Sequence, residues 1–193
     1  MEGIPSKYVG QAESIHPYAE NAMSCIVAFE CRSRGYDVVS VPYENRNASL
    51  QSLMKDAKAA WSDVEGGGAP CFIKLRGRDP SELYREIRGH VKNGKRYMLE
   101  FEWFCQNLRH AVLVIQTGGG RMDVFDPMTG DVMGNAASIC GFLAWMRYGE
   151  EAGPRLLRLD DLGLNLDIVN GVVQARGGSD ERSRHRIPRR EPG

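Results

Sequence analysis

Apolar residues recur at intervals of three and four near the start of the chain, at Ala22, Cys25, Ile26 and Phe29. This spacing predicts a helix over residues 22–33 with one apolar face. Asn21 is a favoured residue at the position before a helix, and Gly35 is favoured just beyond one. Similar patterns predict three later helices, over residues 49–61, 80–92 and 136–148.

Segments rich in β-branched and aromatic residues predict strands between and after these helices. They cover residues 36–42, 71–75, 96–101, 111–117 and 122–125. The second of them has the pattern of a short buried strand, and the glycines at 118–120 join the last two in a hairpin. Residues 156–159 and 167–173 are further strand or edge-strand candidates. Because helices come first and antiparallel strands follow, the chain is predicted to have an α+β fold.

The same pattern divides the chain into three parts. Residues 1–20 show no periodicity and contain Pro5, Gly10 and Pro17, so they are predicted to be a linker or an N-terminal extension. Residues 21–175 carry all the predicted elements and are expected to form one domain. Residues 176–193 are rich in Arg, Ser, Gly and Pro, and we expect this tail to be disordered.

Composition narrows the class of protein only slightly. The 25 basic and 25 acidic residues give a formal net charge of zero, which favours neither nucleic acid nor an anionic membrane as a partner. No run of 18 apolar residues is present, so no membrane span is predicted. The cysteines are irregularly spaced and include no C-x-x-C pair, which argues against a disulfide framework and a zinc site. We therefore expect reduced thiols in a protein made in the cytoplasm, with no metal and no cofactor. The cysteines are Cys25, Cys31, Cys71, Cys105 and Cys140.

The predicted hairpin brings a histidine and an aspartate together. If the glycines at 118–120 form its loop, Thr117 pairs with Arg121. Side chains alternate strictly along strands, so in that register His110 and Asp126 lie on one face as diagonal neighbours. A carboxylate in that place can hold an imidazole in one orientation, as in a catalytic triad. A two-residue turn would shift the register by one and separate them.

A histidine–carboxylate pair of this kind acts with a nucleophile, and a thiol at a helix N-terminus suits it best. There the unpaired N–H groups and the helix dipole lower the pKa of a thiol and supply oxyanion donors. The first turn of the predicted helix offers two positions, Ala22 and Cys25, of which only Cys25 is a thiol. The remaining buried-pattern cysteines, Cys31, Cys71 and Cys140, are interpreted as packing residues.

The segment NAMSCIVAFECRSRGYDV resembles the papain-fold toxin domains of bacterial polymorphic toxins and phage head-morphogenesis proteins. Those domains tend to read N-C-x-x-C-hydrophobic-x-A-x-E-x-R-x-R-G near their start. The later segments GKRYMLEFEW, RHAVLVI and GGGRMDVFDPMTG resemble the second half of the same family, and the similarity covers roughly residues 20–170. The matching residues are Asn21, Cys25, Ala28, Glu30, Arg32, Arg34, Gly35, Trp103, His110, Asp126, Thr129 and Gly130.

The chain departs from the family pattern at two positions. The first cysteine of the family falls on Ala22, which an inactivating Cys-to-Ala substitution would explain. The alternative is that Cys25 is the nucleophile, because SCIVAF resembles the papain-type SCWAF. The family's glutamine after Asp-Pro falls on Met128, which leaves the substrate-side chemistry open. The resemblance further implies Asn21 as the helix cap or an oxyanion donor, and Trp103 and Met128 as residues on the substrate side.

The resemblance implies a papain-like fold, with an N-terminal helix packed on an antiparallel sheet. It also implies a toxin or effector domain that hydrolyses protein through an acyl-enzyme, with His110 as general base and then acid. Peptide cleavage, glutamine deamidation and transglutamination share these residues, so the three remain open. Expected partners are a protein substrate and a cognate immunity protein, and the domain would be delivered from a bacterial cytoplasm into a target cell within a larger protein. The alternative is a catalytically inactive papain-fold binding module.

Overall fold

The computed structural model describes residues 21–44, 46–64, 70–104, 109–149 and 153–176. The predicted linker at 1–20 and nearly all of the predicted tail at 176–193 lie outside these residues. The helices are α2 (Ala22–Ser33), α3 (Ala48–Lys55), α4 (Pro80–His90), α5 (Ala136–Leu143), α6 (Leu166–Val172) and the 3-10 turn η1 (Gly118–Gly120). The strands are β1 (Val38–Ser40), β2 (Trp61–Ser62), β3 (Ile73–Lys74), β4 (Arg96–Glu102), β5 (Arg109–Thr117), β6 (Arg121–Phe125), β7 (Val132–Met133), β8 (Arg155–Arg158), β9 (Gly163–Leu164) and β10 (Val173–Ala175).

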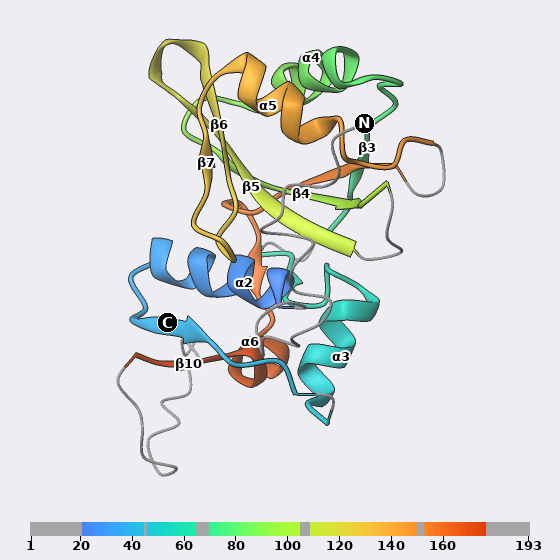
Figure 1. Cartoon of the computed structure of the whole chain (residues 1–193). Coiled ribbons are helices and arrows are strands. Elements are labelled where there is room, and N and C mark those ends of the chain that lie inside the picture. The colour runs from blue at the N-terminus through green and yellow to red at the C-terminus, as the bar shows by residue number, and fades with distance from the viewer. Residues whose placement is uncertain (1–20, 45, 65–69, 105–108, 150–152, 177–193) are drawn as a thin grey trace.

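The centre of the fold is a six-stranded antiparallel sheet in the order β3-β8-β4-β5-β6-β7. Two small antiparallel pairs, β1-β10 and β2-β9, lie outside it. Figure 1 shows α4 and α5 on one side of the sheet and α2 on the other, with α3, α6 and β10 beyond α2. The predicted α+β class with antiparallel strands is therefore confirmed.

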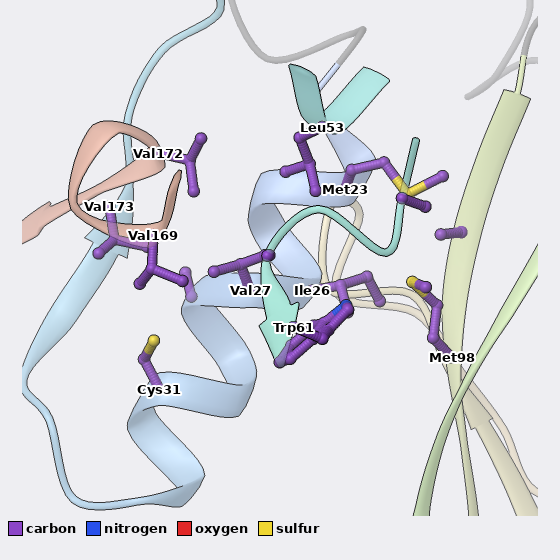
Figure 2. Close-up of a cluster of buried hydrophobic side chains, with 14 of the residues drawn as sticks. Met23, Ile26, Val27, Cys31, Leu53, Trp61, Met98, Val169, Val172 and Val173 are labelled. Carbon is purple, nitrogen blue, oxygen red and sulfur yellow. The ribbon is translucent and has the colours of Figure 1, made fainter. Parts of the chain in front are cut away.

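Alternation along the strands divides the buried residues between two cores. On the α2 side, Met98 and Leu113 join Ile26 of α2 in one hydrophobic cluster, which extends to α3 and α6 (Figure 2). On the other side, Leu99 and Val112 face α4 and α5. The second cluster also contains Leu83, Ile87, Phe101, Trp103, Val114, Ile139, Phe142 and Leu143. Each face of the central strands is thus covered by a different set of helices.

A buried ion cluster ties α2 to the sheet. The Glu30 side chain is fully buried and accepts hydrogen bonds from Arg96, Nε to Oε2 at 2.7 Å and Nη2 to Oε1 at 2.8 Å. Arg34 donates to the same carboxylate at 2.9 Å. Its other nitrogens donate to the carbonyl oxygens of Leu162 and Leu159 at 2.8 and 2.9 Å. Glu30 and Arg34, two residues of the E-x-R-x-R motif, therefore link α2 to β4 and to the chain that follows β8. We call this cluster of Glu30, Arg34 and Arg96 the Glu30 clasp.

Two predicted helices are shorter than their apolar patterns suggest. Residues 49–61 were expected to be helical throughout, but α3 ends at Lys55 and Trp61 pairs with Leu164 as part of β2. Asp56 leaves the helix because its side chain accepts the N–H of Lys58 at 3.0 Å in a local turn.

The helix predicted over 136–148 ends at Leu143 because the following residues extend the sheet. Phe104 N–H donates to the Trp145 carbonyl at 2.8 Å, and Arg147 N–H donates to the Glu102 carbonyl at 2.8 Å. Trp103 and Met146 form an isolated antiparallel bridge between the same segments. Hydrogen bonds to the end of β4 therefore replace those that a longer α5 would have made.

Two strand predictions are wrong in character. Residues 71–75 were expected to be a buried strand, but the strand observed there, β3, is an exposed edge strand of two residues. Leu75, which follows it, is buried. Residues 167–173 were expected to be a strand or an edge strand, but they lie mostly in α6. Asn165 caps α6 by accepting the N–H of Asp167 at 3.3 Å, and Val169 and Val172 are buried in the α2-side core. Their spacing of three suits a short helix as well as a strand.

Among the described residues, no helix is long and apolar enough to span a membrane.

Candidate active site

The β5–β6 hairpin has the register predicted from its loop length. Thr117 pairs with Arg121, and Leu113 pairs with Phe125. Gly119 and Gly120 have φ angles of 79° and 76°, a left-handed conformation that residues with side chains rarely adopt. The glycine loop therefore fixes which residues of the two strands share a face.

This register brings His110 and Asp126 into direct contact. Nε2 of His110 lies 2.8 Å from Oδ2 of Asp126, within hydrogen-bond distance. His110 is 4% exposed and Asp126 is fully buried. The predicted contact between the two side chains is confirmed. A buried carboxylate bonded to Nε2 fixes the orientation of the imidazole ring and its tautomer.

The turn after β6 holds Asp126 in place. Its Oδ1 atom accepts the backbone N–H of Met128 at 2.9 Å and that of Thr129 at 3.4 Å. Burial alone would raise the pKa of the Asp126 carboxyl, but the hydrogen bond and charge of His110, together with these two N–H groups, bring its pKa below the usual range. Asp126 is therefore an ionised, oriented carboxylate, and Met128 contributes to it through its backbone.

Aromatic rings surround the imidazole of His110. The Trp103 ring stacks on it with centroids 5.4 Å apart and planes 30° apart, and the Phe101 ring meets it edge to face at 5.5 Å. Phe142 of α5 packs edge to face against both of these rings. Trp103, expected on the substrate side, is 5% exposed and lies against the imidazole. Phe101 and Phe142 were missed by the sequence analysis, although Phe101 is the cross-strand partner of His110 and could have been found from the β4–β5 register.

The N-terminal turn of α2 begins at residue 22, as predicted. Asn21 occupies the cap position, but its side chain makes no hydrogen bond to the helix backbone. Instead its amide nitrogen donates to the Val41 carbonyl, and its Oδ1 accepts the hydroxyl of Ser24. Asn21 is thus the N-cap residue, as expected, but its side chain does not cap the helix. Its buried amide joins the start of α2 to the chain that follows β1.

The Cys25 thiol lies one turn into α2, and the residue is buried. Its Sγ atom is 3.5 Å from the Ser40 hydroxyl, and its backbone N–H already donates to the Asn21 carbonyl at 3.0 Å. Burial raises the pKa of the Cys25 thiol, and the negative charge of Asp126 adds to the increase, while Ser40 and Arg32 oppose it. A thiol of this kind is mainly protonated at neutral pH.

The body of α2 and the His110 ring lie against opposite faces of β5, but the first turn of α2 is close enough to the His110–Asp126 pair for the charge of Asp126 to raise the pKa of Cys25. Ala111 and Leu113 face α2, whereas His110 lies among the rings on the α5 side. Phe29 of α2 packs on Phe125 with ring centroids 5.3 Å apart. In the described residues β6 pairs with β5 only from Leu113 onwards, so the edge of β5 near His110 has no β6 neighbour. The prediction that residue 22 lies nearer to the imidazole than Cys25 does stays a prediction.

The other cysteines have three different environments. Cys31 is fully buried, and burial raises the pKa of its thiol to about 12. Cys140 is half-buried. Cys71 is exposed, which contradicts its interpretation as a packing residue, because it precedes the edge strand β3 and does not enter the sheet. Cys105 lies outside the described residues. No group of three His, Cys, Asp or Glu side chains in the described segments is arranged to hold a metal ion.

Comparisons with known proteins do not assign a family or a function to this chain. No protein-family model matches the chain, and the comparison with curated proteins finds no significant match. Among solved structures, a crystal structure of the Pseudomonas avirulence protein AvrPphB aligns with 77% of this chain and 95% of its own, at 13% sequence identity and a TM-score of 0.42. A likeness of this extent establishes neither a shared fold nor a shared function by itself.

Proposed function

We propose that this chain is a papain-like, cysteine-dependent hydrolase domain of a bacterial toxin or effector, which acts on protein. The observation that carries the proposal is the buried hydrogen bond between His110 and Asp126. Asp126 is itself oriented by two backbone N–H groups, and His110 is held between Asp126 and the ring of Trp103. An imidazole fixed on one nitrogen by a buried carboxylate is suited to exchange a proton through the other.

In the proposed reaction, the nucleophile thiol gives its proton to His110, and the thiolate attacks the substrate carbonyl carbon. The C–N bond then breaks, and the leaving amine takes the proton from the imidazolium. Water, deprotonated by the same imidazole, attacks the thioester carbonyl, and the carboxylic acid and the free thiol are released. The leaving group is a peptide amine in proteolysis and ammonia in glutamine deamidation.

We assign the nucleophile position to residue 22, which is Ala in this chain. Residue 22 is the first residue of α2, so its N–H has no partner within the helix and the helix dipole is strongest there. Cys25 lacks both advantages, because it lies one turn further along the helix and its N–H donates to the Asn21 carbonyl. Burial does not separate the two positions, because Ala22 is 5% and Cys25 9% exposed. A protein with Ala at position 22 would be an inactive form.

Ala22→Cys tests the assignment by its rate of alkylation with iodoacetamide, followed by mass spectrometry. The introduced thiol should react at neutral pH at least about tenfold faster than the native thiols, because the helix N-terminus and an imidazolium both stabilise thiolate. His110→Ala should remove most of this excess. Asp126→Asn should remove less, because it disturbs the orientation of the imidazole without deleting it.

A matched control separates the histidine from the helix. Ala136 is the first residue of α5, which also begins at an asparagine, so Ala136→Cys places a thiol at a helix N-terminus without a neighbouring His–Asp pair. Ala136 is exposed whereas Ala22 is 5% exposed, so the two thiols are compared by the pKa read from the pH dependence of each rate, which access does not change. The Ala22→Cys thiol should have the lower pKa, and only its pKa should depend on His110. Equal pKa values, unchanged by His110→Ala, would contradict the proposal.

A catalytically inactive binding module is the second candidate, and one observation favours it. The residue at the N-terminus of α2 is Ala22, and the thiol nearest to it in the chain has a raised pKa. If the Ala22→Cys thiol shows no enhanced reactivity while the protein stays folded, the binding module is the better description of the chain.

A further inference from the structure

A small pocket of about 50 Å³ opens at the end of the sheet where β4 ends and β5 begins. It lies close to the candidate active site in the chain, because Arg109 precedes His110 and Phe101 contacts the His110 ring at 5.5 Å. The charged residues in its wall are Lys74, Glu100, Glu102, Arg109 and Arg155.

Strand pairing places these charged side chains on one face of the sheet. Lys74 pairs with Arg155 across β3 and β8, and Arg155 pairs with Glu100 across β8 and β4. Glu102, two residues after Glu100, pairs with Arg109 across β4 and β5. Directly paired residues project to the same side, so four neighbouring strands present one charged row. The row continues the face that α2 covers through Met98 and Leu157.

Both carboxylates in this row form close ion pairs with other arginines, and Arg109 lies farther from each of them. Glu100 is 3% exposed at its side chain and accepts from Arg155 Nε at 2.6 Å. Glu102 accepts from Arg147 Nη1 at 3.2 Å. Arg109 lies 3.8 Å from Glu100 and 3.7 Å from Glu102, beyond hydrogen-bond distance, with 47% of its side chain exposed. The charges of Glu100 and Glu102 therefore hold the Arg109 guanidinium at the pocket, and its N–H groups can donate hydrogen bonds to a bound group.

We propose that this pocket binds a carboxylate side chain of an acidic peptide segment, with Arg109 as the main donor and Lys74 as a second cation. A guanidinium presents paired N–H groups that match a carboxylate, which an ammonium does not. The space suits one such group. Glu100 and Glu102 in the wall oppose a polymer that carries a negative charge on every unit more than a peptide whose carboxylates are spaced apart, so a peptide fits better than a nucleic acid.

This site is independent of the proposed chemistry. A pocket for an acidic segment would select the substrate of a hydrolase, and it would equally select the partner of an inactive binding module. The test below measures binding to the chain with Ala22 in place, so its result does not depend on whether a thiol at position 22 is reactive.

The probe is a fluorescein-labelled peptide with four glutamates spaced by glycines, compared with the same peptide carrying glutamines, and binding is read by fluorescence anisotropy at low ionic strength. The chain should bind the glutamate peptide at least about fivefold more tightly. Arg109→Gln should weaken this binding about fivefold or more, and Arg109→Lys should weaken it less. Lys74→Gln, at an exposed edge-strand position, should also weaken it and gives a second reading if Arg109→Gln does not fold.

Arg121→Gln is the matched control. Arg121 also has a largely exposed side chain beside a carboxylate, but it pairs with Thr117 at the far end of β5. Its replacement makes the same change in net charge and should leave peptide binding unchanged. Equal affinity for the two peptides, or equal losses in Arg109→Gln and Arg121→Gln, would overturn the proposal. If a double-stranded DNA oligonucleotide displaces the labelled peptide at a lower concentration than the unlabelled glutamate peptide does, the choice of a peptide as ligand is overturned.

Discussion

The Glu30 clasp gives a stability prediction whose size follows from its contacts. Glu30→Gln keeps the shape of the side chain but removes its charge and puts an NH₂ group where one carboxylate oxygen accepted. Three hydrogen bonds from Arg34 and Arg96 are affected, at 2.9, 2.7 and 2.8 Å. At least one donor would then face another donor, and two guanidiniums would lose their counter-charge.

The expected loss in free energy of unfolding is about 3–5 kcal/mol, the usual cost of removing one partner from a buried ion pair. Hydrogen bonds to charged groups contribute roughly 1.5–3 kcal/mol each, so loss of two of the three gives a cost of the same order. The arginines are each about a quarter exposed at their side chains and can regain some water, which favours the lower end of that range.

Urea unfolding followed by tryptophan fluorescence and far-UV circular dichroism measures this cost. Glu102→Gln is the control, because Glu102 has a similar arginine partner at 3.2 Å but a side chain that is 22% exposed. It should lose less than about 1 kcal/mol. The midpoint of Glu30→Gln should fall with little change in the slope of the transition. Equal losses in the two variants would refute the view that Glu30 acts as a buried clasp.

Two further predictions concern groups at the site. Because the pKa of Asp126 is lowered in the folded chain, its ionised form stabilises the fold above about pH 4 and this contribution is lost as the pH falls toward its native pKa. Urea unfolding at a series of acidic pH values should therefore show a weaker pH dependence for Asp126→Asn, and curves parallel to those of the unmutated chain would contradict this assignment. Among the thiols, exposed Cys71 should react with iodoacetamide before Cys25, whose raised pKa keeps it protonated. Peptide mapping during limited labelling measures the order, and early modification of Cys25 would restore it as the candidate nucleophile.

Local rules were sufficient for the hairpin. Loop length and strict alternation predicted the pairing of Thr117 with Arg121 and the contact of His110 with Asp126, because both depend only on counting residues from one turn. The helix at Ala22–Ser33 was equally local, since its periodicity is uninterrupted. Predictions held where neighbouring residues in the sequence supply the interacting groups.

Non-local pairing caused the errors. The pattern that predicted a long α5 could not reveal the backbone hydrogen bonds between the end of β4 and residues 145–147, from Phe104 to Trp145 and from Arg147 to Glu102. The short apolar run in α6 suited two periodicities, and packing against α3 decides between them. There Gly171 lies so close to Ser49 that a Cβ atom would meet its hydroxyl at 2.3 Å. The roles of Glu30 and Arg34 were also hidden, because Arg96, which shares the Glu30 carboxylate with Arg34, lies on a distant strand.

The glycine loop of the β5–β6 hairpin gives a distant part of the molecule control over the His110–Asp126 pair. Thr117 lies seven residues after His110 along β5, a span of about 23 Å. Removing one glycine would move every partner of β6 by one place, and Asp126 would project through the opposite face of the sheet. An insertion or deletion of one residue in that loop therefore separates His110 from Asp126, although every side chain of the pair is still present in the sequence. Loop length is thus as much a part of this pair as the two residues themselves.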